Sequence, residues 1–464
     1  MCIICINPFD NIQNLKELNC SNCSKLIEIP QLGTLRKLKC SRNPFLSWIP
    51  QINSLRKLDL SGCLSISHIP RMDELQTLNC SDCVMLKKIP QLQNLRELNC
   101  SYCYIIDHIP QLNLLQKLNC SGCSKLKYIP QLENLKELYC NDCEFLEEIP
   151  LLPNLLKLNC YNNPQLKLIS QMKNLFQLNC HNCYVLAQLP LLHKLQELNC
   201  SSCYLLKYIP HLPNLLELDC SQCPLLKQIS RVEHLVELDC SHCSSLEQIP
   251  CIQNLQELNC SACSKITKIP ELKNLRYLRC CDCNLLKQIP FLEYLEYLFC
   301  SSCSSLEIIP QINNLQMLFC SNCPLLKFIP QINNLKCLYC SDCPLIERIP
   351  QIDNLEELKC FSCKSLMCIS PKMQTLRILD CYECPTLEII PQNNEFKRLA
   401  CHSCLFLYIP YKNRLEHNIL SVNYLIFQLK RVQRRYRLKV LARKILDQMS
   451  KTIKVITNLI IDYC

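Results

Sequence analysis

Pairs of cysteine residues separated by two others recur along the chain and are the first feature that could support chemistry. Seventeen such pairs recur at multiples of about 20 residues, for example Cys120/Cys123 followed by Cys140/Cys143. Sixteen residues lie between these two pairs, which matches the spacing of a two-knuckle zinc site, and paired thiols also serve redox chemistry. Metal binding and a redox role are therefore two hypotheses for the chain.

Three substitutions within the cysteine positions favour a packing role for the thiols instead. Leu60 replaces the first cysteine of one pair, and Asn43 and Asn163 replace the second cysteine of two others. Leucine suits a buried apolar position and asparagine a position that hydrogen-bonds the backbone, whereas neither replaces a thiolate ligand. We therefore expect the thiols to pack in the core, and we expect no metal and no cofactor.

The remaining residues do not suggest a catalytic site. The nine histidines have no position in common: His68 and His108 precede Ile-Pro, whereas His181 and His402 follow a predicted strand. The three glycines are far apart, so the chain has no glycine-rich loop of the kind that binds phosphate. We expect that the protein is not an enzyme.

The cysteine pairs belong to a repeat of 20 residues, for which residues 131–150, QLENLKELYCNDCEFLEEIP, serve as a template. Position eight is leucine in all 20 units, position five is leucine except at Phe396, and position sixteen is leucine or isoleucine. Pro371 is a one-residue insertion. Such a period indicates a solenoid in which each unit packs only on its neighbours.

Each unit has room for one short strand and an irregular return. Polar and apolar residues alternate in Glu97-Leu98-Asn99-Cys100-Ser101, which predicts a half-buried strand. Proline usually closes the unit, and because proline cannot continue a helix, we expect the return segment to be extended or 3-10 helical.

The pattern resembles that of leucine-rich repeat proteins, and it reads Leu95-x-x-Leu98-x-Cys100-x-x-Cys103-x-x-Ile106 in one unit. The resemblance implies a right-handed horseshoe whose short parallel strands line the concave face. Asn43 and Asn163 then fall on the asparagine ladder of the family. The 20-residue length resembles the shortest repeat class, found in bacterial effectors.

The composition is rich in Asn, Ile, Lys and Cys, and in this it resembles that of repeat proteins from giant viruses that infect amoebae, of the mimivirus kind. The start of the chain lacks the pattern of a secretion signal, and no run of about 18 apolar residues suggests a membrane span. We therefore expect a cytoplasmic protein, in the host cell if it is viral.

Three regions follow from the repeat and from the charge: an N-terminal cap segment at residues 1–10, a solenoid of about 20 repeats at residues 11–410, and a C-terminal cap with a basic helix at residues 411–464. The last region contains 12 Lys and Arg against 3 Asp and Glu, so it carries +9 of the net charge of +10. The body of the chain is nearly neutral.

Function on a solenoid is expected where exposed positions depart from the repeat. Positions seven and nine of the strand point outward, and in four successive units they form an acidic strip made of Glu197, Glu217, Asp219, Glu237, Asp239 and Glu257. The next units carry Tyr277, Arg279, Tyr297, Phe299, Met317, Phe319 and Tyr339. Aromatic residues with an arginine are typical of protein-binding hot spots, although aromatic residues also favour strands and stack on each other.

Residues 429–445 contain no Gly or Pro, and Val432, Tyr436 and Val440 recur at four-residue steps, which predicts a basic amphipathic helix. Part of this segment resembles the IQ motif, which calmodulin and related EF-hand proteins bind. The resemblance implies binding through Val432, Gln433, Tyr436, Arg437, Arg443, Lys444 and Ile445. Contact with nucleic acid or an anionic lipid surface, or packing on the solenoid cap, are alternatives.

The leading hypothesis is thus a non-enzymatic scaffold that binds a protein partner on the concave face and a second partner through the basic helix. A metal-binding or redox protein using the cysteine pairs is one alternative. A protein that binds nucleic acid or lipid through its basic tail is another.

Overall fold

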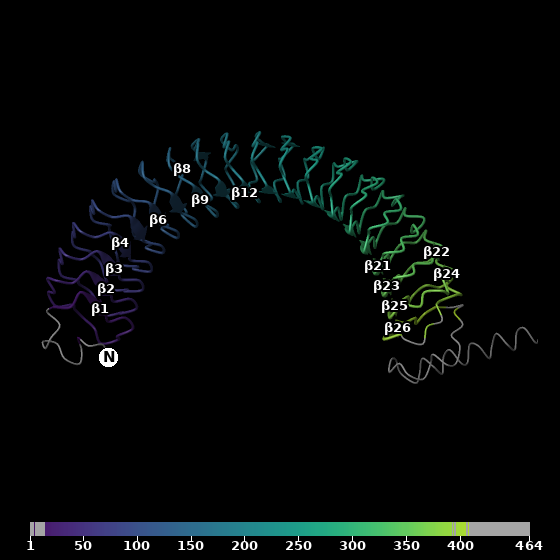
Figure 1. Cartoon of the computed structure of the whole chain (residues 1–464), viewed down its shortest axis with the longest axis horizontal. Helices are drawn as coiled ribbons and strands as arrows, with labels where there is room; N and C mark the ends of the chain where they lie inside the picture. The colour runs from purple at the N-terminus through teal and green to yellow at the C-terminus, as the bar shows by residue number, and fades with distance from the viewer. Residues whose placement is uncertain (1–3, 5–13, 392, 394–395, 405–406, 408–464) are drawn as a thin grey trace, which may run out of the picture.

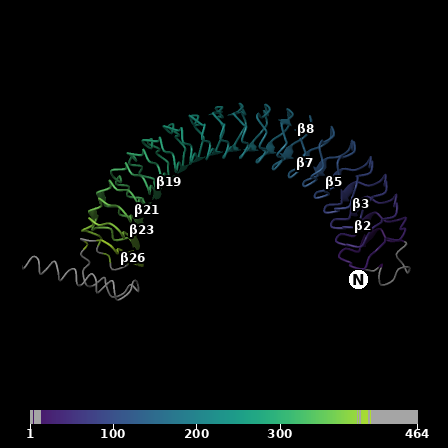
Figure 2. The ribbon, with the colours of Figure 1, turned by 180° about the vertical axis from the view of Figure 1, so that it is seen from behind.

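The computed structural model is an arc of stacked turns, one turn for each 20-residue unit (Figure 1). It describes residues 4, 14–391, 393, 396–404 and 407. The short strands line the inner edge of the arc, and the return segments form its outer edge, as the view from behind also shows (Figure 2). The predicted solenoid with parallel strands on its concave face is therefore confirmed.

One parallel sheet of 20 strands runs along the whole concave face. Consecutive turns supply neighbouring strands in register, so that Leu238 pairs with Leu218 on one side and with Leu258 on the other. The strands are β1 (Glu17–Asn19), β2 (Lys37–Lys39), β3 (Lys57–Asp59), β4 (Thr77–Asn79), β5 (Glu97–Asn99), β6 (Lys117–Asn119), β7 (Glu137–Tyr139), β9 (Lys157–Asn159), β11 (Gln177–Asn179), β12 (Glu197–Asn199), β14 (Glu217–Asp219), β16 (Glu237–Asp239), β17 (Glu257–Asn259), β18 (Tyr277–Arg279), β19 (Tyr297–Phe299), β20 (Met317–Phe319), β21 (Cys337–Tyr339), β23 (Glu357–Lys359), β25 (Ile378–Asp380) and β26 (Arg398–Ala400).

Some return segments contain a short extended stretch, which is one of the two forms that the closing proline predicted. Three pairs of return segments form two-stranded parallel sheets on the outer side. They are β8 (Glu148–Ile149) with β10 (Leu168–Ile169), β13 (Tyr208–Ile209) with β15 (Gln228–Ile229), and β22 (Arg348–Ile349) with β24 (Cys368–Ile369). The described residues contain no 3-10 helix, and the other return segments consist of turns and irregular backbone. The expected C-terminal helix lies outside the described residues.

Seven side chains of a typical turn are buried against its two neighbours. They occupy positions 2, 5, 8, 10, 13, 16 and 19, which in one turn are Leu132, Leu135, Leu138, Cys140, Cys143, Leu146 and Ile149. The repeat pattern predicted the buried leucines and cysteines of the strand side. Positions 2 and 19 add a second row of buried side chains under the outer segments.

From Cys83 onward, the second cysteine of each pair donates a hydrogen bond inside the core. The Sγ atom of Cys103 donates to the carbonyl of Cys80 in the preceding turn at 3.1 Å, and the same contact joins Cys123 to Cys100 at 3.2 Å. Burial raises the pKa of Cys63 to about 11, so its thiol stays protonated at neutral pH. Cys63 therefore packs as a neutral thiol and donates a hydrogen bond to the carbonyl of Cys40 at 2.9 Å.

Where asparagine replaces the second cysteine of a pair, its side chain makes three hydrogen bonds to the backbone in place of one. The Nδ2 atom of Asn163 donates to the carbonyls of Cys140 at 2.9 Å and Cys160 at 2.8 Å, while its Oδ1 accepts from the backbone N–H of Cys143 at 2.8 Å. Asn43 makes the equivalent three bonds. The expectation that these asparagines satisfy backbone groups of the turns is confirmed.

Replacement of Leu238 by alanine tests the buried face. Leu238 is 2% exposed and lies between two identical leucines, so we expect Leu238→Ala to lower the free energy of unfolding by about 2–5 kcal/mol in urea titrations. Lys227→Ala, at an exposed position, is the control and should change it by less than about 0.5 kcal/mol. A loss below about 1 kcal/mol for Leu238→Ala would contradict the assignment of the core.

Two substitutions at Asn163 test the hydrogen bonds that the side chain at position thirteen makes between turns. Asn163→Ala leaves buried backbone groups without their partner, and we expect a loss of about 2–4 kcal/mol. Asn163→Cys restores the Sγ–H donor that most turns use at this position, so it should lose no more than half as much. Equal losses for the two variants, measured by urea unfolding, would show that the thiol donor does not stabilise the turns.

Candidate functional site

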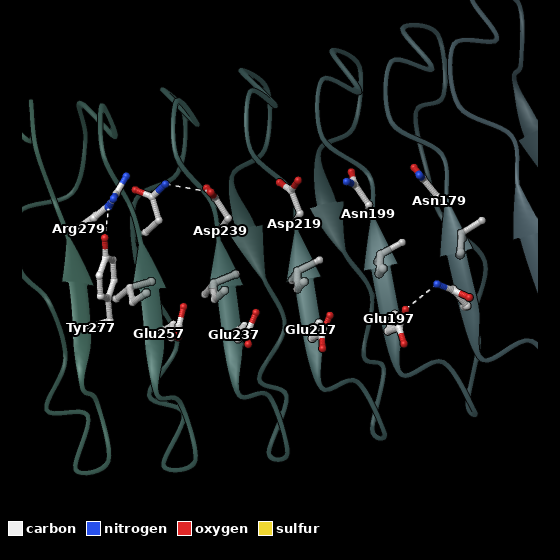
Figure 3. A pocket seen from close by; sticks show the side chains of 17 residues that line it. Asn179, Glu197, Asn199, Glu217, Asp219, Glu237, Asp239, Glu257, Tyr277 and Arg279 are labelled. Atoms are coloured by element: carbon white, nitrogen blue, oxygen red, sulfur yellow. Dashed lines mark hydrogen bonds between the residues drawn. The ribbon is translucent and has the colours of Figure 1, made fainter. Parts of the chain in front are cut away.

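The acidic strip predicted from the sequence lies on the concave surface of β12, β14, β16 and β17. Register pairs Glu197 with Glu217, Glu217 with Glu237, and Glu237 with Glu257, so the four glutamates form one row across four strands. Figure 3 shows this row beside a second row of Asn and Asp side chains at the other end of the strands. Both rows line a shallow concavity of about 530 Å³ that continues to Tyr277.

The glutamate row carries charge that no neighbouring cation neutralises. Among the described residues, no Lys, Arg or His forms an ion pair with any of the six carboxylates of the acidic strip. Partial burial and the like charges of Glu237 and Glu197 raise the pKa of Glu217 above its ordinary value. Approach of a cationic group would relieve this repulsion.

The second row has a structural role that the sequence analysis missed. The Oδ1 atom of Asp239 accepts hydrogen bonds from the backbone N–H and the hydroxyl of Ser241 at 2.9 and 2.7 Å, and Oδ2 accepts from Asn259 at 2.9 Å. In ten turns, an Asn or Asp at position nine caps the N–H two residues later in this way. The recurrence of Asn or Asp at the end of most strands is the signal that could have identified this role, because Asn and Asp side chains favour this local turn.

On the next strands, three neighbouring rings with a cation at each end replace the capping residues. This aromatic ladder consists of Arg279, Phe299, Phe319, Tyr339 and Lys359, all at position nine of β18 to β23. The ring centroids of Phe299 and Phe319 are 4.7 Å apart, and those of Phe319 and Tyr339 are 4.3 Å apart. The guanidinium of Arg279 lies 4.9 Å from the Phe299 ring, and the Lys359 ammonium lies 4.1 Å from the Tyr339 ring.

Position seven adds a second, shorter row of rings. Tyr277 lies 5.8 Å from Tyr297 and 5.3 Å from Phe299 between ring centroids, and its hydroxyl accepts a hydrogen bond from Nε of Arg279 at 2.6 Å. Met317 follows in register with Tyr297. All seven residues that the sequence suggested for partner binding thus lie together on four consecutive strands.

Lys359 closes the ladder, although the sequence analysis did not include it among the site residues. Its Nζ donates to the Tyr339 hydroxyl at 2.9 Å and pairs with Glu357 at 2.9 Å, while the Tyr339 hydroxyl donates to Glu357 at 2.6 Å. Burial, with the nearby Glu357 carboxylate, raises the pKa of Tyr339. A lysine at position nine directly after three aromatic residues is the sequence signal for this network.

The strands that carry the aromatic ladder have no Asn or Asp cap at position nine. The backbone N–H groups of Ser321 and Ser341 instead donate to the hydroxyls of Ser301 and Ser321, both at 3.2 Å. Five consecutive strands share this departure from the repeat, and their rings remain only half-buried. The solenoid itself does not require these residue types, because other turns close with Asn or Asp.

A second concavity of about 730 Å³ lies beside the ladder, at the start of the same strands. Its charges are mixed, and Arg276 pairs with Glu296 at 3.5 Å. Lys336, Glu356 and Arg377 also contribute to its wall. The sequence analysis did not single out these residues, since position six shows no run of one residue type.

The other predicted sites lie elsewhere or outside the described residues. The tail residues Val432, Gln433, Tyr436, Arg437, Arg443, Lys444 and Ile445 all fall outside them. Where the structure is described, no group of three or more His, Cys, Asp and Glu side chains is arranged to hold a metal ion. No helix in that part of the chain is long and apolar enough to span a membrane.

Comparison with known proteins gave one family match. The model of a family described as leucine-rich repeats, in two copies, matches residues 253–294, which include β17 and β18. No curated protein and no solved structure matches the chain significantly.

Glu217→Gln tests the electrostatics of the strip. The pKa of Glu217 is higher in the folded state than in the unfolded state. The contribution of Glu217 to stability therefore falls as the pH rises and its carboxyl group loses the proton. At pH 7 the charged carboxylate destabilises the fold. We expect Glu217→Gln to raise the urea midpoint at pH 7 and to raise it less at pH 4.

Glu144→Gln, away from the strip, controls for the loss of one carboxylate. A gain for Glu217→Gln that is equal at the two pH values, or equal to that of the control at pH 7, would contradict repulsion within the row.

Proposed function

We propose that this chain, which its 20-residue turns and its family match support as a leucine-rich repeat protein, is a non-enzymatic scaffold for protein interaction. In this proposal a protein partner binds the concave face at the aromatic ladder and the adjoining residues Tyr277, Tyr297 and Met317. The acidic strip lies beside this surface and favours a partner that carries cationic groups next to apolar ones.

The observation that carries the proposal is the run of five strands that depart from the capping residue. An Asn or Asp at position nine satisfies a backbone N–H in ten other turns, so a ring at that position serves another purpose or compensates by stacking. Stacked rings contribute about 0.5–1.5 kcal/mol per pair, which is comparable to one hydrogen bond. Replacing the capping Asn or Asp by a ring therefore brings little gain in stability, and stability alone does not explain the rings.

The exposed edges of the rings suit a protein partner. The rings of Phe299 and Phe319 stack with an interplanar angle of 22°, whereas the Tyr339 ring is tilted by 58° from Phe319 and its hydroxyl is held by Lys359 and Glu357. An incoming group therefore meets ring edges and the cations Arg279 and Lys359. Half-buried aromatic and arginine side chains bring much contact area at little loss of side-chain freedom, and such residues dominate protein interfaces. Stacking of nucleic acid bases would require free ring faces.

The proposal includes a second partner for residues 429–445, whose sequence resembles the IQ motif. A calmodulin-like EF-hand protein would accept Val432 and Ile445 in its apolar groove and pair its acidic rim with Arg437, Arg443 and Lys444. Placement in the cytoplasm, of an amoebal host if the protein is viral, belongs to the same proposal and rests on sequence composition.

Affinity capture with the full chain tests the role of the ladder. We expect the double substitution Tyr297→Ala and Phe299→Ala to reduce the recovery of captured partners at least tenfold, because it removes two central rings of the surface. Circular dichroism and the urea midpoint should change little in the same variant.

The matched control is Tyr184→Ala with Tyr204→Ala, which removes another stacked pair, with centroids 4.9 Å apart, outside the concave face. It should leave capture unchanged. If both double variants capture partners as the unsubstituted chain does, or if only the ladder variant unfolds, the ladder is a structural element and the proposal fails.

A further inference from the structure

None of the described residues covers the concave face between β14 and β20, and this face has two parts of different chemistry. At positions seven and nine of these six strands, five carboxylates stand on β14 to β17 and five apolar or aromatic residues on β18 to β20. Arg279 is the one cation among these positions, and its guanidinium is held by the Tyr277 hydroxyl and the neighbouring rings. The surface therefore complements a ligand that is cationic along one part and apolar along another.

The chain itself contains a segment with this chemistry. Residues 429–445 carry eight Lys and Arg, no Asp or Glu, and the spaced apolar residues Val432, Tyr436 and Val440. As the helix that the sequence predicts, 17 residues are about 26 Å long. Six strands spaced by about 4.8 Å extend over about 24 Å, so the segment matches the length of the surface.

The connecting chain is long enough to bring the segment to this surface. From β26 to β17 there are seven strand steps, or about 34 Å at 4.8 Å per step. Residues 408–428 reach about 70 Å if fully extended. Residues 429–445 can therefore lie on the concave face of their own solenoid.

We propose that residues 429–445 dock on the concave face of the same chain between β14 and β20, with their cations beside the acidic strip and their apolar residues against the aromatic ladder. This inference rests on the proposed function, since it assigns an intramolecular ligand to the same surface. The docked segment competes with an external partner for the ladder. Any partner that binds the segment, such as an EF-hand protein, would uncover the concave face.

Zero-length cross-linking with a carbodiimide tests the docking, because this reagent joins only carboxylates and amines that are in contact. We expect the full chain at low concentration to yield cross-links from Lys430, Lys439 or Lys444 to Glu217, Glu237 or Glu257, identified by mass spectrometry. A mixture of ¹⁴N and ¹⁵N protein distinguishes cross-links within one chain from those between chains. Cross-links only between chains would assign the surface to a second copy and overturn the intramolecular proposal.

Charge reversal at arginines separates docking from chance proximity and leaves the reactive lysines in place. Arg434→Glu, Arg435→Glu and Arg437→Glu together should reduce these cross-links at least tenfold. Lys207→Glu, Lys227→Glu and Lys287→Glu, three exposed positions outside the concave face, form the control and should not reduce them. Equal yields from both triple variants would overturn the proposal.

The ladder is tested in the same assay. Phe299→Ala with Phe319→Ala should lower the cross-link yield severalfold while Glu217, Glu237 and Glu257 stay in place. An unchanged yield in this variant would show that the rings do not contact the segment. Absence of all cross-links in the unsubstituted chain, together with partner capture that depends on the ladder, would overturn the docking but leave the proposed function standing.

Discussion

Contact between identical turns is the interaction on which the whole structure depends. Each turn buries the same seven positions against both neighbours, so every leucine at position eight meets another leucine in register. A turn that placed a polar residue there would weaken two interfaces at once. The 20-residue period follows from this requirement, and insertion of Pro371 is accommodated outside the strand, since β25 still pairs in register with β23.

Backbone hydrogen bonds impose a second constraint on the core. Carbonyl groups at position ten lie inside the stack, where no water is needed if a side-chain donor is present. Cysteine meets this need with one weak donor and little volume, and asparagine meets it with two donors at Asn43 and Asn163. The high cysteine content is thus explained by packing and hydrogen bonding between turns.

The sequence predicted the period, the strand and the inward face because each depends on a repeated residue type. It did not predict the left-handed residue at position twelve, where Asp82, Tyr102 and Gln222 all have φ between 56° and 58°. Their residue types differ because the backbone bond to the next turn, as from Asp82 to Ser101 at 2.8 Å, imposes the conformation. Asn, Asp or Gly, which favour this conformation, occupy ten of the 20 positions with positive φ, and this enrichment was the signal that the sequence analysis missed.

The aromatic residues of the candidate site were found from the sequence for the opposite reason, since they break the repeat. The acidic strip and the rings were expected to be neighbours, and register places them so. The stacking order and the Lys359–Tyr339–Glu357 network required side-chain coordinates, because several rotamers are compatible with the same register. The capping role of Asp239 was missed because we expected an exposed polar residue to have no structural role.

The central claim is that the rings of the aromatic ladder serve binding and that the solenoid would fold as well without them. The most direct measurement restores the capping residue of the other turns through Phe299→Asn, Phe319→Asn and Tyr339→Asn, and follows urea unfolding and partner capture in the same samples. The account predicts that the free energy of unfolding stays within about 1 kcal/mol of the unsubstituted chain while capture is lost. A free energy of unfolding that is lower by several kcal/mol, with capture by the folded fraction unchanged, would contradict it.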